Sequence, residues 1–363
     1  MKRESLKKAS FGMLGIAGAC VAGLGLVPTA LAASPGSSAS RGSSATPAAS
    51  VRQWHVVKSV NEGPDAELTA VVATGPTSGW AFESSTTGRP VAYERTGVTT
   101  WKTASFPDVS GDVVFAAAAS QTDVWVFVTE GNRTLVLSLV NGKWLQRGLL
   151  DGDVFQADVV DARNVTFYVP GAAYHFNGAA WSKTGDSTTA ETRGYALSAA
   201  DQWTFSGTKV THIDGKRRTT WNLASLLPAK QELNGPLVVG IYATSDSNVY
   251  AIGSGEAQDA GGPTVVLHYN GHKWSKLATA SVAGNLRADV DPDGSGGLWI
   301  PVSWGGGGTI LHFSGGKLTA TVPLDKSASF YVADVSQIPG TADALAISNT
   351  YSLPGKGEIL QYS

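Results

Sequence analysis

One sequence pattern recurs seven times along the chain, and its seventh copy is incomplete at the C-terminal end. Each copy runs from an apolar strand through a small polar turn to a strand that usually begins with Trp. The apolar strand and turn of the copies lie at residues 92–97, 137–142, 174–178, 211–215, 267–271, 311–315 and 358–363. Such a repeat must be recognised before domains are counted, because each copy is one structural unit whose core is completed by its neighbours.

The N-terminal part of the chain supplies the strand that the seventh copy lacks. The chain stops at Ser363 before any Trp-bearing strand, and residues 53–57, Gln-Trp-His-Val-Val, have the sequence of that strand. Residues 54–363 divide into seven copies of about 44 residues, a normal length for a four-stranded blade. The sequence therefore predicts one all-β domain at residues 52–363, a seven-bladed β-propeller of four-stranded blades, closed by residues 53–57 completing the C-terminal blade.

Two further strands recur at fixed places within each copy. The first strand consists of small and apolar residues, which suit the crowded position nearest the propeller axis. These first strands are expected at residues 68–73, 113–118, 155–160, 194–198, 237–242, 286–290 and 330–335. The second strand follows a turn of Ser, Asp, Asn or Gly and carries an aromatic side chain that we expect to pack between blades. These second strands are expected at residues 79–82, 123–127, 164–168, 201–205, 248–252, 297–300 and 343–347.

Residues 1–32 have the three parts of a secretory signal peptide. Four basic residues lie within positions 2–8, an apolar run covers residues 11–26, and Ala30-Leu31-Ala32 offers small residues for cleavage. Residues 33–51 are rich in Ser, Ala and Pro and carry almost no apolar bulk, so we expect a disordered linker. The sequence predicts a secreted, extracellular protein, associated with the cell wall or free, whose mature chain has no membrane span.

The single Cys, Cys20, leaves a surface lipoprotein scaffold open as an alternative. It follows Ala17-Gly18-Ala19, but apolar residues continue beyond it, which favours an uninterrupted signal core and cleavage after Ala32. The mature chain would then have no Cys. Its net charge would change from −2 to −5, because four basic residues and one acidic residue are removed. We expect no nucleic-acid binding from a mildly acidic chain without basic clusters.

The fifth copy carries a resemblance to a known group of proteins. Residues 248–253, Asn-Val-Tyr-Ala-Ile-Gly, and residues 266–274, Val-Leu-His-Tyr-Asn-Gly-His-Lys-Trp, resemble the repeat of secreted actinobacterial-type β-propeller proteins. These proteins are often described as WD40/BNR-like or galactose-oxidase-like. The resemblance covers residues 54–363 and implies the propeller fold and a secreted context, but no settled activity. The Cys–Tyr crosslink of galactose oxidase has no Cys to form it in the mature chain, and the Ser-x-Asp-x-Gly-x-Thr-Trp box of sialidases is absent.

Four of the six His residues occupy one position of the repeat, three residues before the turn Gly: His175, His212, His268 and His312. Imidazole is a common metal ligand, so a metal site is the alternative to a structural role. Equivalent third-strand positions, held by Glu94, Leu139 and Gln361 in the other blades, should stand roughly 10 Å or more apart. Zn–N bonds need about 2 Å. We therefore interpret these His residues as structural residues that bond across blade edges, and we expect no metal and no cofactor.

Residues 289–294, Asp-Val-Asp-Pro-Asp-Gly, resemble the start of a calcium loop. The twelfth position from Asp289 is Ile300, where that loop needs a bidentate Glu. The segment also falls at the turn between the first and second strands of the sixth copy, so we interpret it as a turn. The chain has no Gly-x-Ser-x-Gly, phosphate loop or His-Glu-x-x-His motif.

The least repetitive segments are the expected binding surface. They connect the second to the third strand and the fourth strand to the next blade, so they gather on one face around the channel mouth, which we name the loop face. Trp304 is the leading candidate, because it follows the expected second strand and precedes Gly305–Gly308, outside any repeat position. It would stack on a ligand or, alternatively, cover its own blade. The other candidate binding residues are Tyr351, Glu130, Arg133, Asp153, Arg193, Glu256 and Arg287.

These observations favour a secreted, monomeric, non-catalytic propeller that binds a glycan or an extracellular protein on its loop face. The alternative is an extracellular glycoside hydrolase or polysaccharide lyase acting at the channel mouth. Glu130 and Asp153 would supply acid and base if they stood at the 5–10 Å typical of glycosidase carboxylates, roughly. The sequence names no catalytic residue and no ligand.

Overall fold

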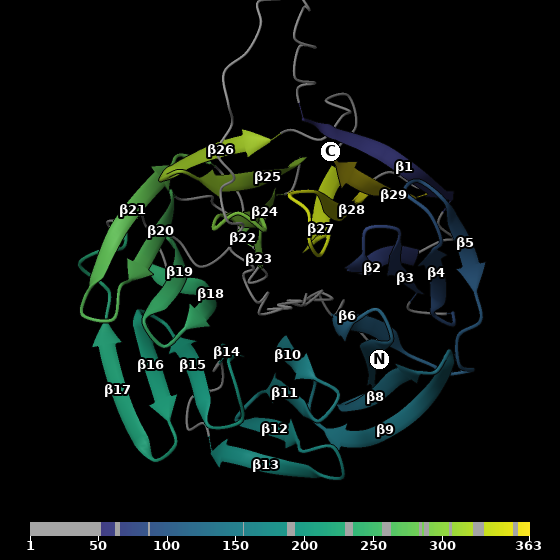
Figure 1. Cartoon of the computed structure of the whole chain (residues 1–363), viewed down its shortest axis with the longest axis horizontal. Helices are drawn as coiled ribbons and strands as arrows, with labels where there is room; N and C mark the ends of the chain where they lie inside the picture. Colours follow the sequence, from purple (N-terminus) through teal and green to yellow (C-terminus); the bar gives the residue numbers. More distant parts are fainter. Residues whose placement is uncertain are drawn as a thin grey trace, which may run out of the picture.

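The computed structural model describes residues 52–61, 66–85, 88–154, 156–186, 193–228, 235–255, 263–282, 285–286, 290–304, 307–321, 330–350 and 355–363. Seven antiparallel sheets lie around a common centre and form the predicted seven-bladed propeller (Figure 1). Within these residues no helix is long and apolar enough to cross a membrane. The only helical backbone we note is a turn at Leu223, whose carbonyl accepts from the N–H groups of Leu226 and Leu227.

Each blade is a meander that runs from the centre of the ring outward. Blades 1 to 3 comprise β2 (Ala66–Gly75), β3 (Ser78–Ser85), β4 (Val91–Arg95) and β5 (Trp101–Ala104); β6 (Asp112–Ser120), β7 (Asp123–Glu130), β8 (Arg133–Val140) and β9 (Lys143–Asp151); and β10 (Gln156–Asp161), β11 (Asn164–Val169), β12 (Ala172–Phe176) and β13 (Trp181–Asp186). Blades 4 and 5 comprise β14 (Arg193–Ala196), β15 (Asp201–Ser206), β16 (Lys209–Asp214) and β17 (Arg217–Asn222); and β18 (Leu237–Ser245), β19 (Asn248–Ser254), β20 (Thr264–Tyr269) and β21 (Trp274–Ala280).

Blade 6 departs from the regular pattern at its inner strand. Two short strands, β22 (Asn285–Leu286) and β23 (Asp291–Pro292), both pair with β24 (Leu298–Trp304) where one first strand was expected at residues 286–290. The blade continues outward through β25 (Gly307–Ser314) and β26 (Lys317–Thr321). Pro292 has no N–H to donate, which is consistent with an inner edge that is not one continuous strand.

Blade 7 contains both ends of the ring, as predicted. It comprises β27 (Phe330–Gln337), β28 (Ala344–Thr350), β29 (Lys356–Tyr362) and, outermost, β1 (Trp54–Asn61). The register runs from Trp54 opposite Tyr362 to Asn61 opposite Lys356. The closing strand therefore begins one residue later and ends four residues later than the predicted residues 53–57. Because it covers the outer edge of β29, the ring is closed between the two chain ends.

Indole side chains join the blades on the outside of the ring. The Trp that begins a fourth strand packs on the aromatic side chain of the second strand in the preceding blade. The ring centroids are 5.5 Å apart for Trp144 and Trp80, 6.3 Å for Trp181 and Trp125, 6.2 Å for Trp274 and Trp203, and 5.5 Å for Trp54 and Trp299. This recurring contact explains why most copies keep Trp at the same place; the sixth copy has Leu318 there.

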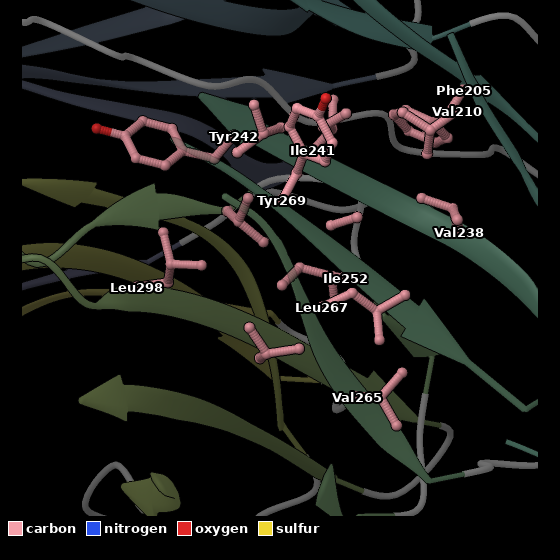
Figure 2. Close-up of a cluster of buried hydrophobic side chains, with 14 of the residues drawn as sticks. Phe205, Val210, Val238, Ile241, Tyr242, Ile252, Val265, Leu267, Tyr269 and Leu298 are labelled. Carbon is pink, nitrogen blue, oxygen red and sulfur yellow. The ribbon is translucent and has the colours of Figure 1, made fainter. Parts of the chain in front are cut away.

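Apolar side chains of neighbouring blades interdigitate between these outer contacts and the axis. The largest cluster combines residues of blades 4, 5 and 6, and Figure 2 shows Phe205, Ile241, Leu267 and Leu298 among its members. Both faces of a blade are thereby buried, so the inner strands are nearly continuous apolar runs, as in β6, where Val113 and Phe115–Ala118 are buried.

Polar side chains near the axis tie each inner strand to the next blade. Asp334 Oδ2 accepts a hydrogen bond from Val71 N (2.9 Å), and Asp158 Oδ2 accepts one from Ala196 N (2.9 Å). Ser84 Oγ accepts from Val113 N at 2.7 Å. These bonds satisfy buried N–H groups that face the neighbouring blade, where an unpaired N–H would be costly.

The strand directions define two ends of the ring. Inner strands start at one end, which is the loop face, and finish at the other, which we name the turn face. On the turn face lie the connections between first and second strands and the hairpins between third and fourth strands.

Candidate functional site

The loop face of blades 1 to 3 is the best described part of the predicted binding surface. In blade 2 the register places Asp112 opposite Thr129, Glu130 opposite Arg133, and Arg133 opposite Asp151. These residues therefore form a line along one end of the sheet, from the inner strand to the outer one. Two predicted residues, Glu130 and Arg133, flank the same two-residue turn.

Carboxylates predominate on this part of the loop face. Seven of them come from blades 1 to 3 and the connections between these blades: Glu67, Glu83, Asp108, Asp112, Glu130, Asp151 and Asp153. The described guanidinium groups there are Arg89, which pairs with Asp108 at 2.5 Å, and Arg133. We name these seven carboxylates the acidic arc. Sequence analysis named Glu130 and Asp153 among its candidate binding residues and did not single out Glu67, Asp108 or Asp151, which lie at strand ends or in a connection between blades.

Hydrogen bonds hold part of the acidic arc in place. Ser110 Oγ donates to Glu130 Oε1 at 3.1 Å, and Tyr93 Oη donates to Glu83 Oε2 at 2.6 Å. Glu67, Asp151 and Asp153 are exposed. The arc therefore combines positioned carboxylates with others that are free to meet a ligand.

Asp112 is a half-buried residue of the arc at the start of β6. Burial raises its pKa, and the neighbouring charge of Glu67 raises it further. Both residues lie at starts of inner strands, β6 and β2, so two adjacent blades bring their carboxyl groups toward the same mouth. Crowding of negative charge at this point favours a cationic ligand, which would lower the electrostatic cost.

Blade 4 contributes basic residues on the other side of blade 3. Arg193, a predicted binding residue, starts β14 and is half-buried, and exposed Lys209 starts β16. The loop face is thus acidic over blades 1 to 3 and basic at blade 4. A ligand that spans this boundary would meet charges of both signs.

The structure describes the remaining predicted binding residues only in part. Tyr351, Glu256 and Arg287 lie outside the described residues. Trp304 is described in its backbone alone: it ends β24, opposite Gly307 across a two-residue turn. The prediction that Trp304 follows the second strand was therefore wrong, since this strand runs four residues past its expected end at Ile300. The involvement of Trp304 and Tyr351 in binding stays a prediction.

The repeated His residues are structural, but they bond within their own blades and not across blade edges as predicted. His212 Nε2 meets Asp201 Oδ1 at 2.8 Å, and His312 Nε2 meets Asp293 Oδ2 at 2.8 Å. Their rings stack on the second-strand indoles of the same blade, with centroids 4.2 Å apart for Trp203 and 4.0 Å for Trp299. His268 meets Asn248 Oδ1 at 2.7 Å, and His175 meets Thr166 Oγ1 at 3.1 Å. In blades 4 and 5 the partner of the His, Asp201 or Asn248, is the first residue of the second strand; in blade 6 the partner, Asp293, lies in the turn before that strand.

Blade 2 shows a substitute for this His. The predicted equivalent, Leu139, was wrong by one residue: Gly142 is the second residue of its two-residue turn, whereas Gly215 and Gly315 are the first residues of theirs, so Ser138 lies opposite Trp125. Arg147 from β9 lies over the Trp125 ring at 5.8 Å and donates to Ser138 Oγ at 2.7 Å. A guanidinium therefore takes the place that imidazole occupies in other blades, using a cation–π contact.

The segment that resembles a calcium loop is a turn whose described carboxylates have protein partners. Asp293 Oδ1 accepts from Ser295 N and Gly297 N, both at 2.7 Å. Asp291 Oδ2 accepts from Gln337 N of blade 7 at 2.5 Å. Across the described residues, no group of three or more His, Cys, Asp or Glu side chains is placed to hold a metal ion.

The aromatic residues of the described chain are used for packing. None of the Phe, Tyr or Trp side chains whose burial is described is exposed. Sugar-binding sites commonly stack pyranose rings on exposed aromatic faces, which amphipathic rings such as Trp provide.

Comparisons with known proteins identify the fold. No protein-family model matches the chain, and no curated protein matches it in sequence. Among solved structures, the chain is similar to "YCF48 bound to D1 peptide", with 13% identity, a TM-score of 0.58 and coverage of 87% of this chain and 98% of that chain. It is also similar to virginiamycin B lyase from Staphylococcus aureus with quinupristin (11% identity, TM-score 0.57, coverage of 85% and 99%). A third similar structure, of the RRP9 WD40 repeats, has 11% identity, a TM-score of 0.57 and coverage of 85% and 97%. At these identities the similarity shows that the chain has a propeller fold.

Proposed function

We propose that this protein is a binding propeller whose loop face holds an extended, basic segment of a protein partner. The observation that carries the proposal is the acidic arc: seven carboxylates against two guanidinium groups over blades 1 to 3. Two structural neighbours support a protein ligand over a sugar, since one was solved with a peptide and another is made of WD40 repeats. The absence of exposed aromatic side chains among the described residues supports the same choice.

The negative charge of the acidic arc would mainly affect which partners bind and how fast they associate. A single exposed charge pair contributes only about 0.2–1 kcal/mol, so no one carboxylate of the arc suffices. Several carboxylates at one mouth create a field that attracts Lys and Arg side chains and repels acidic partners. Exposed Lys209 of blade 4 would receive an acidic residue next to the basic segment, which would set the direction of the bound chain.

A peptide-binding experiment tests the proposal. Fluorescence anisotropy would compare a labelled ten-residue peptide containing four Lys with the same peptide containing four Glu. We expect the Lys peptide alone to bind, and the triple variant Glu67→Gln, Asp112→Asn, Asp153→Asn to weaken binding by about tenfold or more. Binding should also weaken as salt is raised.

A matched control separates local charge from net charge. The triple variant Asp161→Asn, Asp214→Asn, Asp246→Asn removes the same number of carboxylates from the turn face. We expect it to bind the Lys peptide as the unmodified protein does. Equal losses in the two triple variants, or equal binding of the Lys and Glu peptides, would show that the acidic arc is not the binding site.

We also propose that the protein is secreted, because residues 1–32 have the three parts of a signal peptide. Intact mass measurement of the protein exported by its native host should give a chain that starts at Ala33 without lipid. A glycan ligand at Trp304 and Tyr351, and hydrolysis or elimination at the channel mouth, are the alternatives. Wild-type-like glycan binding by a Trp304→Ala, Tyr351→Ala double variant would exclude the first of them.

A further inference from the structure

We infer that Asn141 is a modification site, at which the folded protein deamidates spontaneously and forms isoaspartate. This inference is independent of the proposed peptide binding. It rests on three features of the turn between β8 and β9: its backbone conformation, the freedom of the Asn141 amide, and the open space around Gly142.

The reaction needs only Asn141, Gly142 and water. The backbone N of Gly142 bonds to Cγ of Asn141, the Cγ–Nδ2 bond breaks, and the proton of the Gly142 N–H leaves with Nδ2 as ammonia. Water then opens the resulting succinimide ring. Opening at Cγ gives Asp, and opening at the main-chain carbonyl gives isoaspartate, in which the chain runs through Cβ and Cγ. A following Gly suits the first step, because no Cβ obstructs the attacking N.

Four Asn-Gly pairs occur in the sequence, and the structure describes three of them completely. These three are Asn141-Gly142, Asn177-Gly178 and Asn270-Gly271, and each lies in the hairpin between the third and fourth strands of its blade. Asn234 of the fourth pair lies outside the described residues. Blades 2, 3 and 5 therefore offer the same chemical groups in three different surroundings.

The hairpin of blade 3 restrains Asn177 in two ways. Asn177 Oδ1 accepts hydrogen bonds from Ala179 N and Ala180 N, both at 3.0 Å. The side chain of Arg163 lies against Gly178, so close that a Cβ on this Gly would stand 2.7 Å from Arg163 Cγ. Both hydrogen bonds must break, and the packed Gly must move, before Cγ and the Gly178 N can meet.

The hairpin of blade 5 restrains Asn270 in the same two ways. Asn270 Oδ1 accepts from His272 N at 3.1 Å and from Lys273 N at 3.0 Å. Gly271 lies against Ser247, where a Cβ on this Gly would stand 2.9 Å from Ser247 Cβ. The local structure therefore protects Asn270 as it protects Asn177.

The hairpin of blade 2 lacks both restraints. The Asn141 side chain is exposed and forms no hydrogen bond with another described residue. Apart from its chain neighbours, no heavy atom lies within 4 Å of the place that a Cβ would take on Gly142. Among the described residues, Asn141 is also the one non-Gly residue with a positive φ, at 51°, a region that L-residues occupy at some cost. Neither a bonded amide nor a packed Gly opposes the rotation that brings Cγ to the Gly142 N.

Isoaspartate at this position would act on the contact between blades 1 and 2. It lengthens the main chain of a two-residue turn, and the pairs Val140–Lys143 and Leu139–Trp144 follow that turn directly. The Trp144 ring packs on Trp80 of blade 1 with centroids 5.5 Å apart. The longer turn displaces the strand that carries this contact, so we expect the modified protein to unfold at a lower urea concentration.

Peptide mapping tests the inference. The folded protein is aged for several days in a mildly alkaline buffer and digested, and mass spectrometry with electron-transfer fragmentation distinguishes isoaspartate from Asp. Trypsin releases Asn141 in a peptide of its own, residues 134–143. We expect Asn141 to convert about tenfold or more faster than Asn177 and Asn270, since two hydrogen bonds protect each of these.

Ageing in guanidinium chloride separates the effect of the fold from that of the sequence. The restraints are absent from the unfolded chain, so the three rates should agree within about threefold. The matched variant is Asn141→Gly, which accepts a positive φ and has no amide to react. Its peptide 134–143 should stay unmodified, conversion at the other Asn residues should be unchanged, and its urea midpoint should be the same before and after ageing.

Three results would overturn the inference. They are no conversion of Asn141 in the folded protein, folded-state rates that differ no more than the rates in guanidinium chloride, and an unchanged urea midpoint of the unmodified sequence after Asn141 has converted. None of these measurements involves the acidic arc, so the two proposals can fail separately.

Discussion

Replacing Asp293 by Asn tests how much the hydrogen bonds of the Asp293 carboxylate contribute to the free energy of unfolding of the ring. The side chain is 2% exposed and lies in the turn between β23 and β24. Burial by itself would raise the pKa of Asp293. Hydrogen bonds from His312, Ser295 and Gly297 outweigh burial and lower that pKa from 3.8 to about 2. The difference corresponds to about 2.4 kcal/mol of stability in favour of the folded protein with ionised Asp293.

The pH dependence of this stability has a definite sign. Because the folded pKa is depressed, the contribution is complete above the unfolded value of 3.8 and is lost as the pH falls toward 2, approximately. The contribution should be about 2.4 kcal/mol at pH 7 and about 1.3 kcal/mol at pH 3. Asn keeps an oxygen for the N–H groups of Ser295 and Gly297 but has no charge to offer His312. The variant should therefore be destabilised by about 2 kcal/mol at neutral pH, and by less in acid.

Urea unfolding followed by Trp fluorescence at pH 3, 4, 5 and 7 measures this effect. Trp299 stacks on His312 in the same blade and reports on the site directly. Asp246→Asn is the matched control, since Asp246 lies in the corresponding turn of blade 5 and should change stability by less than about 0.5 kcal/mol. The reasoning would be refuted if Asp293→Asn cost the same at pH 3 as at pH 7, or no more than the control.

The structure leads to two further predictions, one for a deletion and one for a substitution. Deleting residues 52–58 removes Trp54, which is 2% exposed, and uncovers the edge of β29. The melting temperature should therefore fall by about 10 °C or more. An unchanged melting temperature would contradict the closure of the ring by β1. Asp158→Asn should have the opposite sign to Asp293→Asn. Burial raises the pKa of Asp158 well above its usual value, so the carboxyl group destabilises the fold increasingly as the pH rises above its unfolded pKa, whereas Asn still accepts from Ala196 N. Denaturant unfolding should show the Asp158 variant to be at least as stable as the parent at pH 7 and equal to it in acid, and a marked loss at pH 7 would contradict the argument.

The number of blades and the closure of the ring were predictable from the sequence. Six of the seven blades contribute the same Trp, and all contribute a turn of small polar residues and an apolar inner strand; these are local patterns that recur at a nearly fixed spacing. The missing Trp strand of the last copy and the extra Trp strand at residues 53–57 leave one pairing, which the register of Trp54 with Tyr362 confirms.

Errors arose where a single residue shifts the register. Leu139 and Ser138 differ by one position, and the place of the turn Gly, second in the turn of blade 2 and first in the turns of blades 4 and 6, decides which of them faces Trp125. A one-residue change moves a side chain to the other face of the sheet. Arg147 takes the place of His in that blade from a different strand, and spacing along the sequence carries no information about such a substitution.

The candidate site depended on tertiary structure for a different reason. Glu67, Asp112 and Glu130 belong to three strands of two blades, and only the closed ring brings their carboxyl groups to one part of the loop face. The repeat determined which residues build a blade, because local spacing fixes the strands. Only the ring decided which charges share a face, because Coulomb interactions depend on distance through space and not on position along the chain.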